Sequence, residues 1–86
     1  MKKIIGVFHP FDLYQTFYVY EDSEKLEAVQ TKIEDIPETV FKLSEMYNVD
    51  KVDIAGTKMF TRGIMKRIQN EEMLKYSKNK IEIKLV

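Results

Sequence analysis

The sequence predicts one α/β (α+β) domain over residues 1–86, with five strands and two helices in the order β-β-β-α-β-α-β. Two observations carry this prediction. The first 31 residues hold three strand-like segments, one a continuous apolar run and two in which apolar and polar side chains alternate. After residue 35, two segments with helical periodicity each precede a short strand-like run. We therefore expect two layers, with the helices packed on a mixed five-stranded sheet.

The first three strands are expected to form a meander. Residues 2–8 (KKIIGVF) form a continuous apolar run rich in β-branched residues, which indicates a central strand buried on both faces. Residues 16–22 (TFYVYED) alternate, with Phe17 and Val19 on one face. After a turn, residues 25–31 (KLEAVQT) form a weaker third strand.

The first helix is expected over residues 35–48 (DIPETVFKLSEMYN). Asp35 and Glu38 have the spacing of a capping box, and Asn48 is typical of a helix end. Four residues share the face expected to point to the core: Ile36, Val40, Leu43 and Tyr47.

The second half of the chain repeats the strand–helix–strand pattern. Residues 49–56 (VDKVDIAG) predict a short buried strand, and residues 57–76 predict the second helix. Residues 80–86 (KIEIKLV) alternate as a strand covered on one face. The second helix is expected to turn these residues inward: Phe60, Ile64, Met65 and Ile68.

This element order resembles the ribonuclease H-like fold over nearly the whole chain, in element order and not in motif. The resemblance implies the strand order 3-2-1-4-5. Two right-handed crossovers then place both helices on one face of the sheet. Because the chain ends at Val86, we expect the other face to be uncovered and to carry Thr16, Tyr18 and Tyr20 beside apolar side chains of the first strand.

That uncovered face is rich in aromatic residues. Six of the ten aromatic residues fall between Phe8 and Tyr20, and a broad exposed aromatic patch is typical of an interface. We therefore expect a homo-oligomer, with a dimer favoured. The alternative is a half-polar sheet face that is simply in contact with water.

A candidate ligand site lies where the first and fourth strands end, because open α/β sheets bind ligands at the carboxyl ends of their strands. His9 and Asp12, in the sequence HPFD, follow the first strand. Thr57, Lys58 and Arg62 open the second helix, whose N-terminus favours an anion. These five residues predict a pocket for a small anionic ligand such as a phosphate or nucleotide. The competing interpretation is a strand end and a solvated helix face.

The resemblance also implies a nuclease, whose carboxylates would hold two divalent metal ions. The first strand, IIGVF, carries no carboxylate, Asp12 comes several residues late, and Asp53 lies inside the fourth strand. With no cysteine and one histidine, a zinc site is also disfavoured. We expect no catalytic residues, no metal and no cofactor, and keep a divergent metal-dependent nuclease as the alternative.

Charge and composition complete the prediction. The net charge is zero, but residues 1–55 carry a balance of −5 and residues 56–86 a balance of +5. A third interpretation is therefore nucleic-acid binding through the basic second helix, which the zero net charge disfavours.

No apolar stretch reaches the length of a membrane helix, so we expect a cytoplasmic protein with no membrane partner. The composition, the expected fold and the lack of catalytic motifs together suit a non-enzymatic binding protein, such as a phage-type accessory or inhibitor protein. Its ligand would be a protein partner or a small anion.

Overall fold

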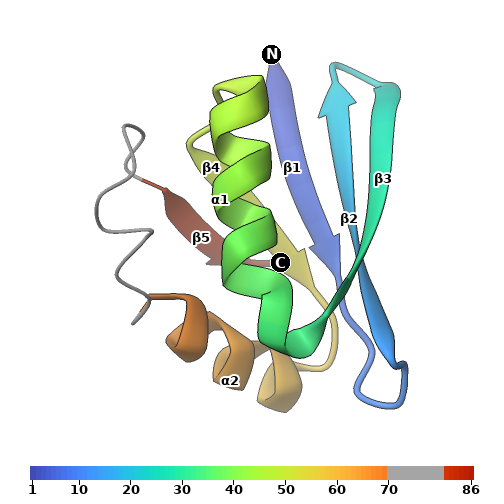
Figure 1. Ribbon diagram of the computed structural model, residues 1–86, viewed down its shortest axis with the longest axis vertical. Helices are drawn as coiled ribbons and strands as arrows, with labels where there is room; N and C mark the ends of the chain where they lie inside the picture. Colours follow the sequence, from blue (N-terminus) through green and yellow to red (C-terminus); the bar gives the residue numbers. More distant parts are fainter. Residues whose placement is uncertain (70–80) are drawn as a thin grey trace.

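The computed structural model describes residues 1–69 and 81–86, and it confirms the predicted α/β fold class. Two helices lie on one side of an open five-stranded sheet with the strand order β3-β2-β1-β4-β5 (Figure 1). The part of the second predicted helix that covers residues 70–76 lies outside the described residues. The elements are β1 (Lys2–Val7), β2 (Tyr14–Glu21), β3 (Glu24–Lys32), the 3-10 turn η1 (Ile33–Asp35), α1 (Ile36–Tyr47), β4 (Lys51–Ala55), α2 (Lys58–Gln69) and β5 (Glu82–Leu85).

The sheet is mixed, with β1 at its centre. β1 pairs with β2 in the antiparallel sense and with β4 in the parallel sense, and β4 pairs with β5 in parallel. A tight turn containing Asp22, with a φ of 56°, connects β2 to β3. The pairing of β2 with β3 shifts register between Val19 and Tyr20. β3 and β5 are therefore the two edges of the sheet.

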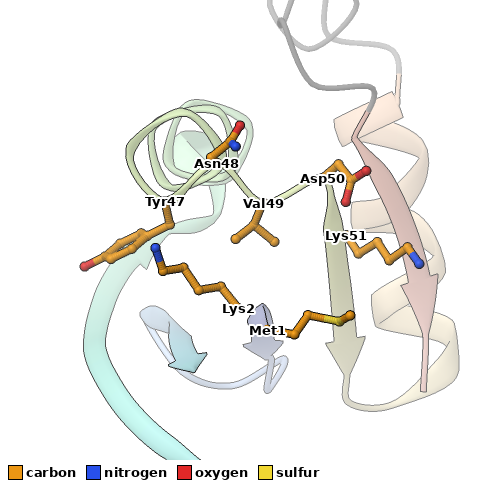
Figure 2. A pocket seen from close by; sticks show the side chains of 7 residues that line it. All are labelled: Met1, Lys2, Tyr47, Asn48, Val49, Asp50 and Lys51. Atoms are coloured by element: carbon orange, nitrogen blue, oxygen red, sulfur yellow. The ribbon is translucent and has the colours of Figure 1, made fainter. Parts of the chain in front are cut away.

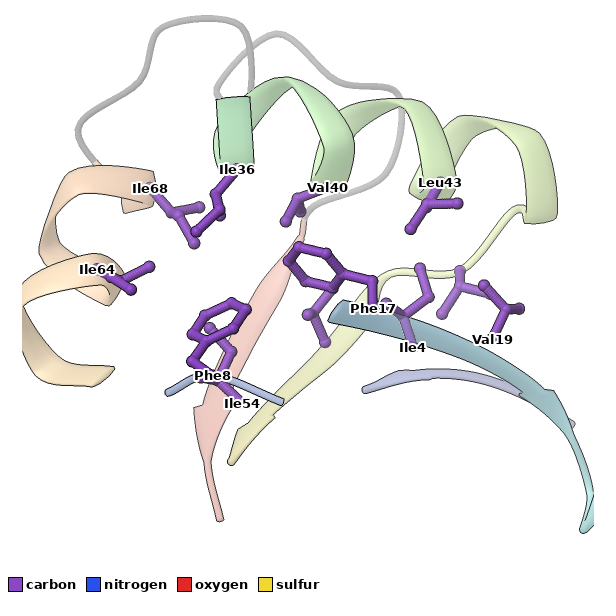
Figure 3. Packing of buried hydrophobic residues seen from close by; sticks show 12 residues of the cluster. Ile4, Phe8, Phe17, Val19, Ile36, Val40, Leu43, Ile54, Ile64 and Ile68 are labelled. Atoms are coloured by element: carbon purple, nitrogen blue, oxygen red, sulfur yellow. The ribbon is translucent and has the colours of Figure 1, made fainter. Parts of the chain in front are cut away.

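The core lies between the sheet and the two helices (Figure 3). β1, β2 and β4 each send alternate side chains to this face, so it is the inner face of the sheet. α1 and α2 close over it with side chains at helical spacing, as predicted for most of them. Tyr47 and Phe60 are only partly buried at the margin of the core, and Met65, which was expected to point inward, is half-buried outside it. The core residues are Ile4, Phe8, Phe17, Val19, Ile36, Val40, Leu43, Val49, Val52, Ile54, Ile64 and Ile68.

The ends of α1 agree with the sequence prediction only in part. Asn48 ends the helix in the left-handed conformation, with φ 54° and ψ 51°, as expected for a stop signal. The predicted capping box of Asp35 and Glu38 is wrong, since the side chain of Asp35 makes no cap hydrogen bond. The physical reason is that Ile33–Asp35 already form a 3-10 turn, which leads the backbone into α1.

The expectation that β1 is buried on both faces is also wrong. Ile4 is fully buried on the inner face, whereas Val7, on the opposite face, is 46% exposed and Lys3 is also exposed. Both helices cover the same side of the sheet, so even the central strand keeps one side accessible (Figure 1).

Candidate functional site

β1 and β4 meet closely at their carboxyl ends, where the ligand site is predicted. The Phe8 amide donates a hydrogen bond to the Ala55 carbonyl oxygen, at 2.9 Å. Gly56 follows with a φ of 154°, and a Cβ at this position would lie 2.6 Å from the Phe8 carbonyl oxygen. Only glycine fits this close backbone approach. The chain therefore leaves both strands at one place, and α2 begins two residues after Gly56.

The loop between β1 and β2 is held in place by Gln15, which is 1% exposed. Its Oε1 accepts a hydrogen bond from the His9 amide at 2.7 Å. Its Nε2 donates to the carbonyl oxygens of His9, at 2.9 Å, and Asp12, at 3.0 Å. A single buried side chain thus satisfies three backbone groups and fixes the shape of the loop.

His9 and Asp12 lie on this fixed loop with their side chains exposed. The His9 Nδ1 is 3.9 Å from the Asp12 Oδ1 and accepts a hydrogen bond from the Phe11 amide at 3.3 Å. Because Nδ1 is engaged by the Phe11 amide, Nε2 is the ring nitrogen that is left to face a ligand. The side chains of His9 and Asp12 are 60% and 66% exposed.

The start of α2 presents two cations to solvent. Thr57, Lys58 and Arg62 are all exposed. Thr61, which is 2% exposed, anchors this first turn by donating from its hydroxyl to the carbonyl oxygens of Thr57, at 3.0 Å, and Lys58, at 3.2 Å. Lys58 and Arg62 lie four residues apart and so share a helical face.

The five predicted ligand residues therefore belong to two segments that leave the sheet at the same end. Within residues 1–69 and 81–86, no hydrogen bond or ion pair joins His9 or Asp12 to the start of α2. All five side chains are exposed. Their convergence on one anion remains a prediction.

The outer face, opposite the helices, carries the three predicted interface residues, Thr16, Tyr18 and Tyr20, all half-buried. The Tyr18 and Tyr20 rings are 6.3 Å apart, and the Lys25 ammonium lies 5.8 Å from the centre of the Tyr18 ring. On this face, Val7 pairs with Thr16 and Ile5 with Tyr18. We call the outer surface of β1, β2 and β3 the apolar half. Its apolar and aromatic residues lie beside polar ones that the strand register puts on the same face, Lys3, Lys25, Gln30 and Lys32. The former are Ile5, Val7, Tyr14, Tyr18, Tyr20, Leu26 and Ala28, with Thr16 between them.

The outer surface of β4 and β5 is different, and we call it the charged half. Its strand register places Lys51 opposite Glu82 and Asp53 opposite Lys84. Lys3 of β1 adds an ion pair with Asp53, at 3.3 Å. A hollow of 570 Å³ opens here, and it is lined by Met1, Lys2, Lys3, Asp22, Lys51, Asp53, Glu82 and Lys84.

A second hollow, of 480 Å³, lies at the opposite end of the sheet from the predicted ligand site (Figure 2). It opens where β1 and β4 begin and α1 ends. Figure 2 shows Val49 pointing toward Met1 and Lys2, with Asp50 and Lys51 on the side of β5. The two hollows share Met1, Lys2 and Lys51.

Sequence reasoning missed Gln15 and Thr61, although both left a signal. Gln15 occupies the same face of β2 as Phe17 and Val19, so it is a polar side chain at a core position. Thr61 precedes Ile64 by three residues on the buried face of α2. A polar residue at a position that faces the core indicates that its side chain makes specific hydrogen bonds there.

The two acids considered for a nuclease occupy different surroundings. Asp12 lies in the β1–β2 loop, whereas Asp53 is on the outer face in its ion pair with Lys3. In the described part of the chain, no group of three His, Cys, Asp or Glu side chains could hold a metal ion. None of the described helices has the length and apolar character needed to cross a membrane.

No family model matches the chain, and no curated protein matches it in sequence. Among solved structures, the chain is similar to a Bacteroides thetaiotaomicron protein described as having an actin-like ATPase fold and unknown function. The TM-score is 0.64 at 14% identity, and the match covers 99% of this chain and 32% of that one. At this identity the likeness concerns the fold alone. The actin-like ATPase and ribonuclease H-like folds share this arrangement of strands and helices, so the resemblance holds at the level of architecture.

Proposed function

We propose that this chain is a cytoplasmic interaction protein that acts by binding and pairs with a second copy of itself through the outer face of its sheet. The observation that carries the proposal is the apolar half. It presents tyrosine and aliphatic side chains over three adjacent strands, and no described element packs on it.

Burial is the physical reason for pairing. A domain of 86 residues has a small core, and shielding further apolar surface contributes about 25 cal/mol per Å². Tyrosine suits an interface because its ring is apolar while its hydroxyl can remain hydrated at the rim. A two-fold pairing buries the same patch on both copies and leaves no patch free for further growth.

The test is to place opposite charges on the apolar half. The double variant Tyr18→Glu, Tyr20→Lys should halve the molar mass seen in light scattering, because both charges would have to be buried at the interface. Glu38→Gln, on the exposed side of α1 and away from the outer face, is the matched control and should leave the mass unchanged. A wild-type protein that is already monomeric at high micromolar concentration would rule out pairing.

The same proposal includes an anionic ligand at the carboxyl ends of β1 and β4. The supporting observations are the fixed loop that presents the His9 Nε2 and the exposed cations Lys58 and Arg62 at the start of α2. A helix N-terminus adds free backbone amides that favour an anion such as phosphate. The solved structure similar to this chain is of unknown function, so the ligand must be inferred from the residues of this chain.

Titration with inorganic phosphate and with ATP, followed by calorimetry, tests this site. Lys58→Ala and Arg62→Ala should each weaken binding several-fold, and Lys42→Ala, an exposed lysine on α1, should not. Equal losses at all three positions would indicate diffuse electrostatics and contradict a defined site. Binding that is seen only with nucleic acid and falls steeply with salt would favour the basic-helix interpretation.

A further inference from the structure

Gln15 occupies a core position although its side chain is polar. It is 1% exposed on the inner face of β2, in line with the apolar residues Phe17 and Val19. Burying an amide group costs free energy unless its polar atoms are hydrogen-bonded, whereas an aliphatic side chain would fill the same space without needing partners. The reason for an amide at this position must therefore lie in the groups that it binds.

The hydrogen bonds of Gln15 are concentrated on His9. The His9 amide donates to Oε1 at 2.7 Å, and the His9 carbonyl oxygen accepts from Nε2 at 2.9 Å. The third bond goes to the carbonyl oxygen of Asp12, at 3.0 Å. Gln15 thus binds the backbone of His9 on both sides of its Cα atom, which fixes the direction in which the imidazole leaves the chain.

The backbone of His9 also adjoins the start of α2. The Phe8 carbonyl oxygen lies so near Gly56 that a Cβ there would come within 2.6 Å of it. This contact joins the residues that directly precede His9 and Thr57. Phe8 is itself held in place, since it is 3% exposed and its amide donates to a carbonyl oxygen of β4. His9 is therefore fixed by β4 through the residue before it and by β2 through Gln15.

We propose that Gln15 is the positioning residue of the anion site: by holding the backbone of His9, it directs the imidazole Nε2 to an anion bound at the start of α2. This inference rests on the proposed anion site and adds the residue that prepares it. A side chain that is held before binding loses less conformational entropy when the ligand arrives. Gln15 does not touch the anion in this arrangement, because it is buried beneath the loop.

A double-mutant cycle separates positioning from a general contribution to stability. Gln15→Met keeps a side chain of similar length and removes the three hydrogen bonds. His9→Ala removes the imidazole and keeps the backbone groups that Gln15 binds. In calorimetric titrations with inorganic phosphate, Gln15→Met should raise the dissociation constant roughly threefold or more when His9 is present. In the His9→Ala background the same change should have little effect, because the ring that Gln15 positions is gone.

Ser44→Ala is the matched control. Ser44 is buried and polar like Gln15, and its hydroxyl donates to the Val49 carbonyl oxygen where α1 ends, at the opposite end of the sheet from the anion site. Ser44→Ala should lower the urea midpoint of unfolding, as Gln15→Met does, and leave the dissociation constant for phosphate unchanged. Equal weakening of phosphate binding by the two variants would mean that affinity follows stability, and it would overturn the positioning role.

The ring of His9 gives a second readout, because it is the single histidine of the chain and its NMR signals can be followed without ambiguity. Saturating phosphate should shift these signals in the wild type. The shift should be smaller in Gln15→Met, since the ring is no longer held beside the anion. An equal shift in both proteins would contradict the role of Gln15.

The remaining outcomes separate this inference from the proposed anion site. If Gln15→Met does not fold, Gln15→Asn takes its place, because its amide is one methylene too short to reach both His9 and Asp12. An equal loss of affinity with and without the His9 ring would remove the positioning role and leave the anion site standing. A wild-type protein that binds no phosphate would remove both.

Discussion

The inner and outer faces of this sheet are built from the same strands, yet they differ in what their side chains do. On β2, Phe17 and Val19 are fully buried, while their neighbours Tyr18 and Tyr20 are half-buried on the other side. The alternation of a strand sorts side chains onto two faces, but it does not decide which face is covered. The right-handed crossovers place both helices on one side. The inner face therefore contributes the core that stabilises the fold, whereas no described element packs on the outer face.

The largest difference in stability between the two faces is expected when two adjacent aromatic residues of β2, Phe17 and Tyr18, are truncated one at a time. Phe17 is 0% exposed and packs edge-to-face on Phe8, with ring centres 5.4 Å apart. Phe17→Ala should lower the free energy of unfolding by roughly 3–5 kcal/mol, because it leaves a cavity in the core. Tyr18→Ala, on the outer face, should cost about 1 kcal/mol or less. Urea unfolding followed by circular dichroism measures both.

The protein concentration matters for this measurement. Pairing through the outer face would stabilise the folded state by mass action and add to the apparent cost of Tyr18→Ala. The unfolding curves should therefore be recorded at concentrations where the protein is monomeric. Equal losses for Phe17→Ala and Tyr18→Ala under that condition would contradict the division between the two faces.

Two glycines, one on the inner face of the sheet and one in α2, give smaller expected changes in stability. A Cβ at Gly6 would lie 2.8 Å from Cε1 of Phe17 and 3.0 Å from Cζ of Phe8, so the inner face has no room for it. Gly6→Ala should cost roughly 1–3 kcal/mol through overpacking. A Cβ at Gly63, in α2, meets no atom within 4 Å. Gly63→Ala should stabilise the protein by about 0.5–1 kcal/mol, since alanine favours a helix. Thermal unfolding shows whether each variant is more or less stable than the wild type. Destabilisation by Gly63→Ala would contradict the open space around this residue.

The architecture could be predicted because several independent signals agreed. Alternation identified β2, helical spacing identified α1, and the handedness of crossovers placed the helices. The burial of β1 was predicted wrongly, since its apolar run does not reveal how many layers cover it. The start of α1 was predicted correctly, with Asp35 at the N-cap, but the capping-box hydrogen bond was not, because the pattern carries no information about the 3-10 turn that leads into the helix.

The candidate site was less accessible to sequence reasoning. Segments that follow adjacent parallel strands must leave the sheet at the same end, so the common location of His9 and Thr57 could be inferred. The hydrogen bonds of Gln15 could not be inferred from the sequence. Its three bonds to backbone groups depend on the conformation of the loop and not on a motif. The exposure of Phe11 and Leu13 was equally hidden, since an apolar residue in a loop can point to either side.

The smallest expected effect concerns the margin of the inner face, where α1 reaches the edge strand β3. Tyr47 of α1 donates a hydrogen bond to the carboxylate of Glu27 on β3. This hydrogen bond raises the pKa of Tyr47 above its usual value of 10.0, and partial burial and the negative charge of Glu27 act in the same direction. A raised pKa means that the fold favours the neutral phenol. The stabilisation is therefore fully present below pH 10.0 and is lost as the pH rises through the higher pKa of the folded protein.

Comparing wild type with Glu27→Gln between about pH 8 and pH 11 measures this contribution. The wild-type protein should lose additional stability at the alkaline end, and the variant should lose less, because glutamine accepts the bond without a charge. Tyr47→Phe, which has no ionisable group at this position, should likewise remove the additional loss. The informative quantity is the difference between the urea unfolding curves of the three proteins. Parallel curves for all three would mean that the bond between Tyr47 and Glu27 does not join α1 to the edge of the sheet in solution.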